Sequence, residues 1–425
     1  MGQWTSGRGA GAGVTLAVDA AVPAVGEAAR RRGLRALLAA TFFAWGGFFM
    51  VVPLIAVHYV DGLGWAAASI GLVLAVRQFA QQGLTPLSGV LADRIGAKGL
   101  ICGGMLVRAV GFLALAVADT PARLMAAVIV AAIGGALFES PRAAAIAALT
   151  TDADRPRFYS LVGVASGLGV TLGTQVGALL IGVDFALVCV VAAVCFFLIF
   201  WIMLIFLPPV RIARRGGSAW GGVRLAVRDR PFMIYNALMV GHWSISAQYS
   251  ISLPLAATGV TGTTNGVAWV YGVNAGVTVL LGYPLPRLAG RRLTPPATLV
   301  LGTSLMALGL AAVGAAGGVL ALLLATFVFS LGTVLARPSE QTVTAGLADP
   351  AALGSYFGVA SLSLALGGGL GNYAGGILYD LGQRTDRPGL PWALFCAVGL
   401  LSAAGLWLTM SSPWRRGHVR PVGNA

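Results

Sequence analysis

Six ionisable residues interrupt the long apolar stretches of this sequence. They are Arg77, Arg108, Glu139, Arg142, Arg337 and Glu340. A charged side chain at the centre of a bilayer costs at least ~2.5 kcal/mol on insertion scales, so such groups need ionic partners or a water-filled cavity. Buried carboxylates can bind and release protons, and arginines suit anionic or zwitterionic compounds. These residues predict a polar site inside an apolar protein.

Four of the six form two short-range pairs. Glu139 and Arg142 stand three residues apart, as do Arg337 and Glu340, and this spacing places both members on one face of a helix. A proline lies between the members of each pair and frees backbone carbonyls at the same depth. Two interpretations follow, a structural charge clamp and a proton-coupling site.

Arg108 and Glu139 are predicted to lie near the middle of the membrane. At 1.5 Å per residue, Arg108 lies roughly 15 Å beyond Lys98, and Glu139 lies roughly 15 Å before Leu149, where the apolar segments begin and end. The two side chains could therefore pair with each other.

Further polar residues lie within predicted spans. Gln78, Gln81 and Gln82 surround Arg77, and Arg77 and Gln81 share one helix face. They could line a substrate cavity or form a structural hydrogen-bond network. His242 could titrate near neutral pH, or it could be a buried residue with satisfied hydrogen bonds.

The composition places the chain in a membrane. Hydrophobic residues make up 57% of the 425 residues and charged residues only 10%, with a mean hydropathy of +0.85. The net charge of +14 does not indicate nucleic-acid binding, because Arg and Lys fall in short hydrophilic breaks, as membrane orientation signals do. The four cysteines lack metal-ligand spacing, and we expect neither a metal nor a cofactor.

Twelve apolar segments follow one another along the chain. They run at about 35–60, 67–90, 99–118, 123–149, 157–182, 185–207, 232–258, 267–289, 297–315, 318–346, 353–379 and 391–411. The fold class is therefore all-α integral membrane protein with twelve spans. The Gly/Ala-rich, aperiodic start predicts a disordered tail 1–34. The longest polar break is a central loop 208–231, which separates a six-helix half 35–207 from a second six-helix half 232–411, followed by a tail 412–425.

The basic residues also predict the orientation of these spans. Most of the 28 Lys and Arg residues fall in the breaks that share a side with residue 1, including the central loop. Cytoplasmic loops carry such an excess of positive charge. Both termini and the central loop are therefore predicted to be cytoplasmic in the plasma (inner) membrane.

The second half repeats the first without gaps at an offset of 198 residues. Gly134, Glu139, Arg142, Leu149, Gly169, Gly173 and Gly177 correspond to Gly332, Arg337, Glu340, Leu347, Gly367, Gly371 and Gly375. The glycines keep their positions, whereas the two charges are exchanged. A parallel repeat in an apolar chain is typical of transporters built from two similar halves around a central site.

The break between the second and third segments carries a motif. It reads Gly89-Val-Leu-Ala-Asp93-Arg94-Ile-Gly96-Ala-Lys98 and resembles the signature of the major facilitator superfamily at the same loop. The resemblance implies two pseudo-symmetric bundles of six helices, and a loop that locks the inner gate when the transporter is open to the outside. Segments 1, 4, 7 and 10 would line the cavity and bring the two charge pairs face to face.

Glycines four residues apart mark segments 5 and 11. Gly169, Gly173 and Gly177 form a series similar to the antiporter motif of drug-exporting members of this superfamily, and Gly367, Gly371 and Gly375 repeat it. The sequence departs from that motif at Thr174 and Ala178. Close helix packing and a directional hinge both remain open for these glycines.

The wider resemblance, to the multidrug-efflux branch of the twelve-span drug:proton antiporters, covers almost the whole chain beyond the first tail. Val60–Trp65, Val76–Gln82 and Gly104–Arg108 carry it. It implies proton-coupled export of small amphipathic compounds by a functional monomer in a lipid bilayer, with Glu139 as the first candidate for protonation and Glu340 as the second. In that branch the tenth span typically reads Glu-Pro-x-Arg, which Arg337–Glu340 reverses.

The sequence leaves two other functions open. One is uptake of a small anionic or zwitterionic nutrient, because the spans carry more arginines than glutamates. The other is a receptor or scaffold that transports nothing. No nucleotide-binding loop, nucleophile elbow or metal cluster stands in a hydrophilic break, so an enzyme is not expected.

Overall fold

A computed structural model describes residues 26–151, 154–209, 219–349 and 352–410, and this part of the chain is helical with no strand. The helices are α1 (Glu27–Ala56), η1 (Val57–Gly62), α2 (Ala67–Ile95), α3 (Ala97–Leu115), α4 (Pro121–Leu149), α5 (Arg155–Leu180), α6 (Phe185–Phe206), α7 (Ala219–Arg228), α8 (Arg230–Ser246), η2 (Ala247–Tyr249), α9 (Ser252–Thr261), α10 (Asn265–Leu281), α11 (Pro284–Gly290), α12 (Pro295–Gly314), α13 (Val319–Leu347), α14 (Leu353–Arg384) and α15 (Leu390–Met410).

The helices coincide with the twelve predicted segments. In the described part, eight are long and apolar enough to cross a membrane, or nine when the bent pair α10 and α11, which meet at 57°, is one span. The other three segments are α2 and α14, which carry more polar residues, and the interrupted rod formed by α8, η2 and α9. Large hydrophobic side chains on outward faces, such as Leu204 and Leu401, are exposed, as a lipid-facing surface requires.

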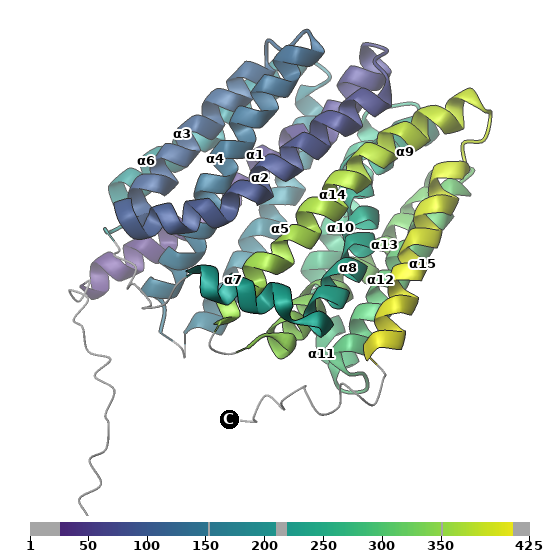
Figure 1. Cartoon of the computed structure of the whole chain (residues 1–425). Coiled ribbons are helices and arrows are strands. Elements are labelled where there is room, and N and C mark those ends of the chain that lie inside the picture. Colours follow the sequence, from purple (N-terminus) through teal and green to yellow (C-terminus); the bar gives the residue numbers. More distant parts are fainter. Residues whose placement is uncertain (1–25, 152–153, 210–218, 350–351, 411–425) are drawn as a thin grey trace, which may run out of the picture.

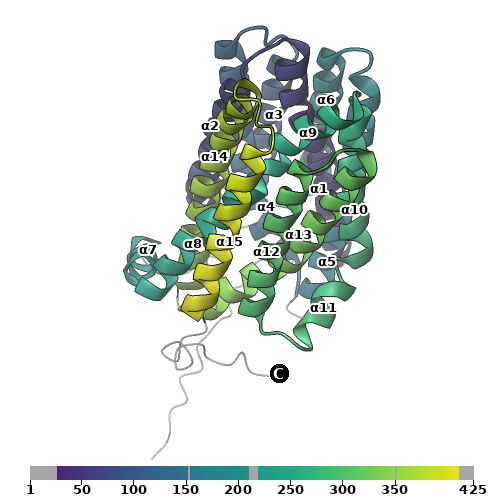
Figure 2. The same ribbon diagram turned by 90° about the vertical axis from the view of Figure 1, so that its right-hand side faces the viewer.

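Two groups of helices lie beside each other (Figure 1). Helices α1 to α6 pack among themselves, and α8 to α15 do the same. The main contacts between the groups are those of α2 with α14 and of α5 with α10. Figure 2 shows α12, α13 and α15 on the outer side of the second group. This arrangement is consistent with the proposed halves 35–207 and 232–411.

The first predicted boundaries need correction. Residues 27–34 belong to α1, where Glu27 forms ion pairs with Arg30 and Arg31 at 3.1 and 2.7 Å. Pairs at these spacings support a helix, so the prediction of a disordered tail was wrong there. The central segment also contains a helix, α7, which the sequence analysis did not predict (Figure 2). Residues 1–25 and 411–425 lie outside the described residues.

The ends of the bundle differ in how the two groups meet. We call the end with residues 57–66, 181–184 and 262–264 the distal end, and the opposite end, where α1 begins and α15 ends, the terminal end (Figure 1). Among the described residues, the hydrogen bonds that join the two groups all lie near the distal end. They run from the N–H groups of Ala67 and Ala68 to Asp380, from Thr258 to Asp61, and from Gln175 to the carbonyl of Ala268.

Asp380 makes the most specific of these contacts. Its two carboxylate oxygens accept hydrogen bonds from the N–H groups of Ala67 and Ala68, each at 2.9 Å. Ala67 and Ala68 form the first turn of α2, whereas Asp380 belongs to α14. A carboxylate at a helix N-terminus satisfies free N–H groups and interacts favourably with the helix dipole. We call this contact the distal latch.

The repeated glycines lie where helices approach each other most closely. An added Cβ at Gly169, Gly173 or Gly177 would overlap the carbonyl oxygens of Phe42, Gly46 and Met50 in α1, and one at Gly367 or Gly371 would overlap those of Val240 and Ser244 in α8. Each contact in the second group lies 198 residues beyond its counterpart in the first. The repeat is therefore a repeat of helix packing.

Substitution of one glycine tests this packing. We expect Gly173→Ala to lower the free energy of unfolding by about 1–3 kcal/mol, because the new methyl group meets the carbonyl of Gly46. The matched control is Gly163→Ala on the same helix, where no atom lies within 4 Å of the added Cβ. Thermal unfolding in detergent measures both variants. Equal melting temperatures for the two would contradict the assignment.

A second prediction concerns the distal latch. Asp380→Ala removes an acceptor of two N–H groups, and such caps contribute about 0.5–2 kcal/mol. We expect the two groups to be separated at the distal end in a larger fraction of Asp380→Ala molecules than of unmodified molecules. Spin labels on Leu63→Cys and Thr263→Cys, in a background without the native cysteines, would report that distance by electron paramagnetic resonance.

The control for this experiment is Asp184→Ala. Asp184 accepts a hydrogen bond from the N–H of Ala186 at 3.1 Å and so caps α6 within the first group. It should leave the distance distribution unchanged. If Asp380→Ala and Asp184→Ala behave alike, Asp380 does not hold the two groups together.

Candidate functional site

Two adjoining cavities lie among α1, α2, α3 and α4, and both are lined by Phe48, Gln81 and Arg108. The first is also lined by Arg77 and several apolar side chains. The second is also lined by Glu139 and Trp45. Three of the six predicted charged residues, Arg77, Arg108 and Glu139, are therefore brought together.

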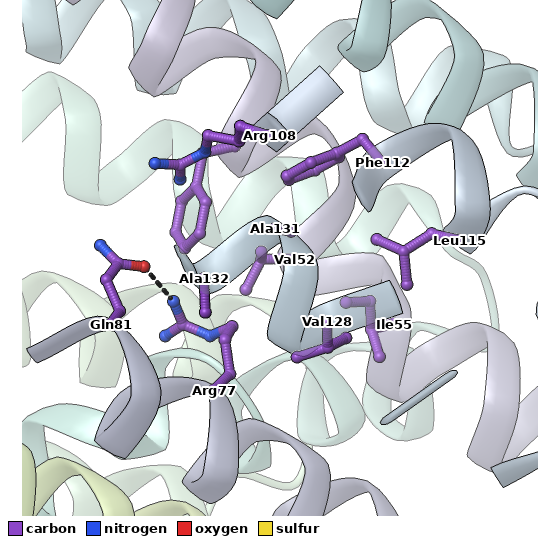
Figure 3. A pocket seen from close by; sticks show the side chains of 11 residues that line it. Val52, Ile55, Arg77, Gln81, Arg108, Phe112, Leu115, Val128, Ala131 and Ala132 are labelled. Atoms are coloured by element: carbon purple, nitrogen blue, oxygen red, sulfur yellow. Dashed lines mark hydrogen bonds between the residues drawn. The ribbon is translucent and has the colours of Figure 1, made fainter. Parts of the chain in front are cut away.

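Arg77 forms hydrogen bonds with two glutamines of its own helix, α2. Its Nη1 donates to Oε1 of Gln81 at 3.1 Å, and its Nη2 donates to Oε1 of Gln78 at 3.0 Å. The guanidinium Cζ lies 5.1 Å from the centroid of the Phe48 ring, within the range of a cation–π interaction. Gln81 points into the cavity beside Arg77 (Figure 3). Gln78 instead packs against Gly368 of α14.

Arg108 does not form the ion pair with Glu139 that their predicted depth in the membrane would allow. In the described part of the chain no ion pair involves Arg108, although both side chains line the second cavity. Its guanidinium lies over two aromatic rings, 5.1 Å from the centroid of Phe48 and 4.9 Å from that of Phe196. These rings supply attraction without cancelling the charge.

Glu139 pairs with Arg142, as their spacing predicted. Nη2 of Arg142 lies 3.3 Å from Oε2 of Glu139. The Glu139 side chain is 37% exposed and that of Arg142 only 12%. Nη1 of Arg142 also donates to Thr41 of α1 at 3.3 Å. The pair thus lies at the wall of the second cavity, where water can reach the carboxylate.

Arg337 and Glu340 have their described contacts with other residues of α1, α8 and α13. The Arg337 guanidinium Cζ lies 5.9 Å from the ring centroid of Trp45, so this contact crosses from α13 to α1. Thr344 forms a side-chain hydrogen bond with Glu340, and the Tyr235 hydroxyl donates to the Glu340 carbonyl oxygen at 3.3 Å. Among the described ion pairs, none joins Glu139 or Arg142 to Arg337 or Glu340. The clamp between the halves is not closed in this conformation.

His242 lines neither cavity. It is 3% exposed, and its Nδ1 shares a hydrogen bond of 2.9 Å with the hydroxyl of Thr303 in α12. Its ring also contacts Trp243 edge to face at 5.1 Å between centroids. It holds α8 against α12, as a buried histidine with a satisfied hydrogen bond does.

The motif between α2 and α3 is only partly described. The backbone of Gly89, Asp93 and Arg94 continues α2. Gly96 has a φ of 87°, a conformation that glycine adopts readily, and it precedes α3. The tight turn between the two helices therefore depends on this glycine. Lys98 follows in the first turn of α3.

An aromatic cluster that the sequence analysis missed joins the two groups above the charged residues. Phe49 of α1 lies 6.2 Å from Tyr249 and 5.9 Å from Tyr271 between ring centroids, and it stacks on Trp45 at 5.6 Å. The four-residue spacing of Trp45 and Phe49 could have indicated a shared aromatic face. Their partners in the second half could not be read from the sequence.

Comparisons with known proteins agree with this architecture. A family model described as Major Facilitator Superfamily matches residues 37–371. The "Multidrug resistance protein MdtH" of Photorhabdus laumondii is 40% identical over 360 residues, which cover 85% of this chain and 90% of that protein. The protein of the same name from Edwardsiella ictaluri is 39% identical over 383 residues, 90% of this chain and 95% of that protein.

Solved structures support the fold. A mutant of the nucleoside transporter NupG superimposes with a TM-score of 0.77 at 15% identity and covers 90% of this chain and 100% of that chain. A POT family transporter in complex with 5-aminolevulinic acid gives a TM-score of 0.74 at 15% identity, over 89% of this chain and 96% of that chain. At these identities the likeness concerns the fold alone.

Proposed function

We propose that this chain, which belongs to the major facilitator superfamily, is a secondary transporter. In this proposal it exports small amphipathic compounds in exchange for protons. The observation that carries this proposal is the identity of about 40%, over most of both chains, to proteins named for multidrug resistance. The chain is a multi-pass membrane protein, and its substrates are small molecules. The coupling to protons is our inference from the site.

The mechanism that we propose is alternating access. The two six-helix halves would rock about the cavity region, so that one end opens while the other closes. The hydrogen bonds near the distal end and the aromatic cluster beneath them support a closed distal end in this conformation. With both termini in the cytoplasm of the plasma (inner) membrane, as we propose, this state faces inward.

Glu139 is our first candidate for the proton carrier. Its carboxylate is partly exposed in the second cavity and forms its ion pair with Arg142 of the same helix. Protonation would neutralise Glu139 and release the Arg142 guanidinium to other partners. Arg108 lines the same cavity, so a proton on Glu139 would also increase the net positive charge that a substrate meets. Protonation of Glu139 and binding of a substrate in the second cavity could in this way compete.

Glu340 is the second candidate. It lies in α13, the repeat counterpart of α4, in contact with Thr344 and near Arg337. The alternative role of these charges is a clamp that closes between the halves in another conformation. Coupling and clamping make different predictions, because a clamp contributes to every conformational cycle and a coupling group contributes only to proton-driven ones. The functional unit that we propose is a monomer.

The test replaces each glutamate with its neutral isostere. We expect Glu139→Gln to reduce proton-driven efflux from reconstituted vesicles at least about tenfold, because the side chain can no longer take up a proton. Substrate exchange without a pH gradient should persist. The same pair of assays on Glu340→Gln ranks the second candidate. Efflux is followed with fluorescent amphipathic compounds, with and without an imposed pH gradient.

Glu27→Gln serves as the control, since Glu27 is exposed at the start of α1 and pairs only with Arg30 and Arg31 among the described residues. It should transport as the unmodified protein does. Undiminished proton-driven efflux by Glu139→Gln would remove Glu139 from the coupling mechanism. Equal losses of driven efflux and gradient-free exchange would favour the clamp.

A further inference from the structure

Arg77 and Arg108 form a cationic pair with no ion-pair partner among the described residues, and the carboxylate that shares a cavity with Arg108 is Glu139. Their side chains are buried, with 9% and 5% of the residue surface exposed. Both guanidinium Cζ atoms lie 5.1 Å from the centroid of the same Phe48 ring, so they cannot be farther apart than twice that distance. Within the described residues, no carboxylate forms an ion pair with either of them.

The hydrogen-bonding capacity of the pair is also incompletely used. Nε of Arg77 and Nε of Arg108 are buried and have no hydrogen-bond partner among the described residues. Glutamine oxygens accept from Arg77, but they are neutral and leave its charge in place. A buried cation without a counter-charge is costly, and such groups inside a membrane protein indicate a functional site.

The internal repeat shows that helix packing does not require these arginines. At an offset of 198 residues, Arg77 corresponds to Ala275 and Arg108 to Met306. The surrounding packing is otherwise conserved between the halves. Gly134 lies against the backbone of Arg108, and Gly332 lies in the same way against the backbone of Met306. The same helix geometry is thus built with uncharged residues in the second half.

The first cavity has one polar side and one apolar side (Figure 3). The guanidinium groups of Arg77 and Arg108 and the amide of Gln81 lie on the polar side. Phe112, Leu115 and Val128 are among the apolar residues that lie opposite. The first cavity adjoins the second cavity, where Glu139 is partly exposed, through the shared side chains of Gln81 and Arg108.

We propose that Arg77 and Arg108 form a subsite for the carboxylate of an exported amphipathic compound, whose apolar body extends along the apolar residues that line the two adjoining cavities. This inference rests on the proposed function and names its substrate class. Arginine presents a planar fork of donors that matches the two oxygens of a carboxylate. The bound carboxylate supplies the direct ion-pair partner that neither arginine has among the described residues. Compounds with a carboxylate, including zwitterions, are therefore preferred over neutral analogues of equal shape.

The experiment uses the full-length protein in vesicles and matched pairs of aromatic carboxylates and their carboxamides. A diethylaminocoumarin carboxylate and its carboxamide serve as the fluorescent pair. The unmodified protein is expected to bind the carboxylates about tenfold more tightly than the carboxamides, the factor that a charge-assisted hydrogen bond provides. Arg77→Gln and Arg108→Met are each expected to abolish this preference while leaving carboxamide binding within about twofold.

Two features keep the test decisive. Arg108→Met introduces the side chain that the second half carries at the corresponding position, so it suits the local packing. Arg123→Gln is the control, because Arg123 is 65% exposed and pairs with Asp119 at 2.6 Å, away from both cavities. It should keep the preference for carboxylates. Melting temperatures verify that each variant is folded.

The outcomes separate this inference from the proposed function. If the unmodified protein shows no preference for carboxylates, or if both arginine variants keep it, the subsite is disproved. Export of neutral and cationic compounds together with no preference for carboxylates over carboxamides would overturn the subsite and leave the export function standing. Failure to export any compound, whatever its charge, would overturn the proposed function itself.

Discussion

The close approach of helix backbones at repeated glycines is the constraint on which the rest of the structure depends. Gly173 lies against the carbonyl of Gly46, and Gly371 lies against that of Ser244, at equivalent places in the two groups. Membrane helices gain little from hydrophobic burial against each other, so close packing of small residues supplies much of their association. These contacts make each group of six spans a firmly packed unit.

The membrane environment explains which parts of the fold the sequence predicts. A membrane requires each span to be apolar and helical locally, and therefore hydropathy located all twelve segments. Hydropathy missed the early start of α1 at Glu27, which depends on polar contacts. It also missed α7, which lies in the polar segment between the two halves. The break between α8 and α9 was missed because hydropathy averaged over a segment does not report where a helix is interrupted.

The candidate site was predictable only where it is local. The Glu139–Arg142 pair follows from a three-residue spacing on one helix, and the structure contains it. The pairing of Arg108 with Glu139 needed the orientation of two side chains on different helices, and depth in the membrane alone does not give that. The contact of Asp380 with Ala67 joins residues more than 300 positions apart, which no local pattern reports.

The ion pair within α4 also bears on how the halves can move. Because Glu139 pairs with a residue of its own helix, this ion pair can persist while the two groups separate or approach. The contacts that must break to open the distal end are others, chiefly the N–H groups of α2 on Asp380 and the hydroxyl of Thr258 on Asp61. Such hydrogen bonds contribute about 1 kcal/mol each, since water replaces them when they break. A proton or a substrate can therefore shift the conformational equilibrium with an interaction energy of a few kcal/mol, and charges inside the first half are placed to supply it.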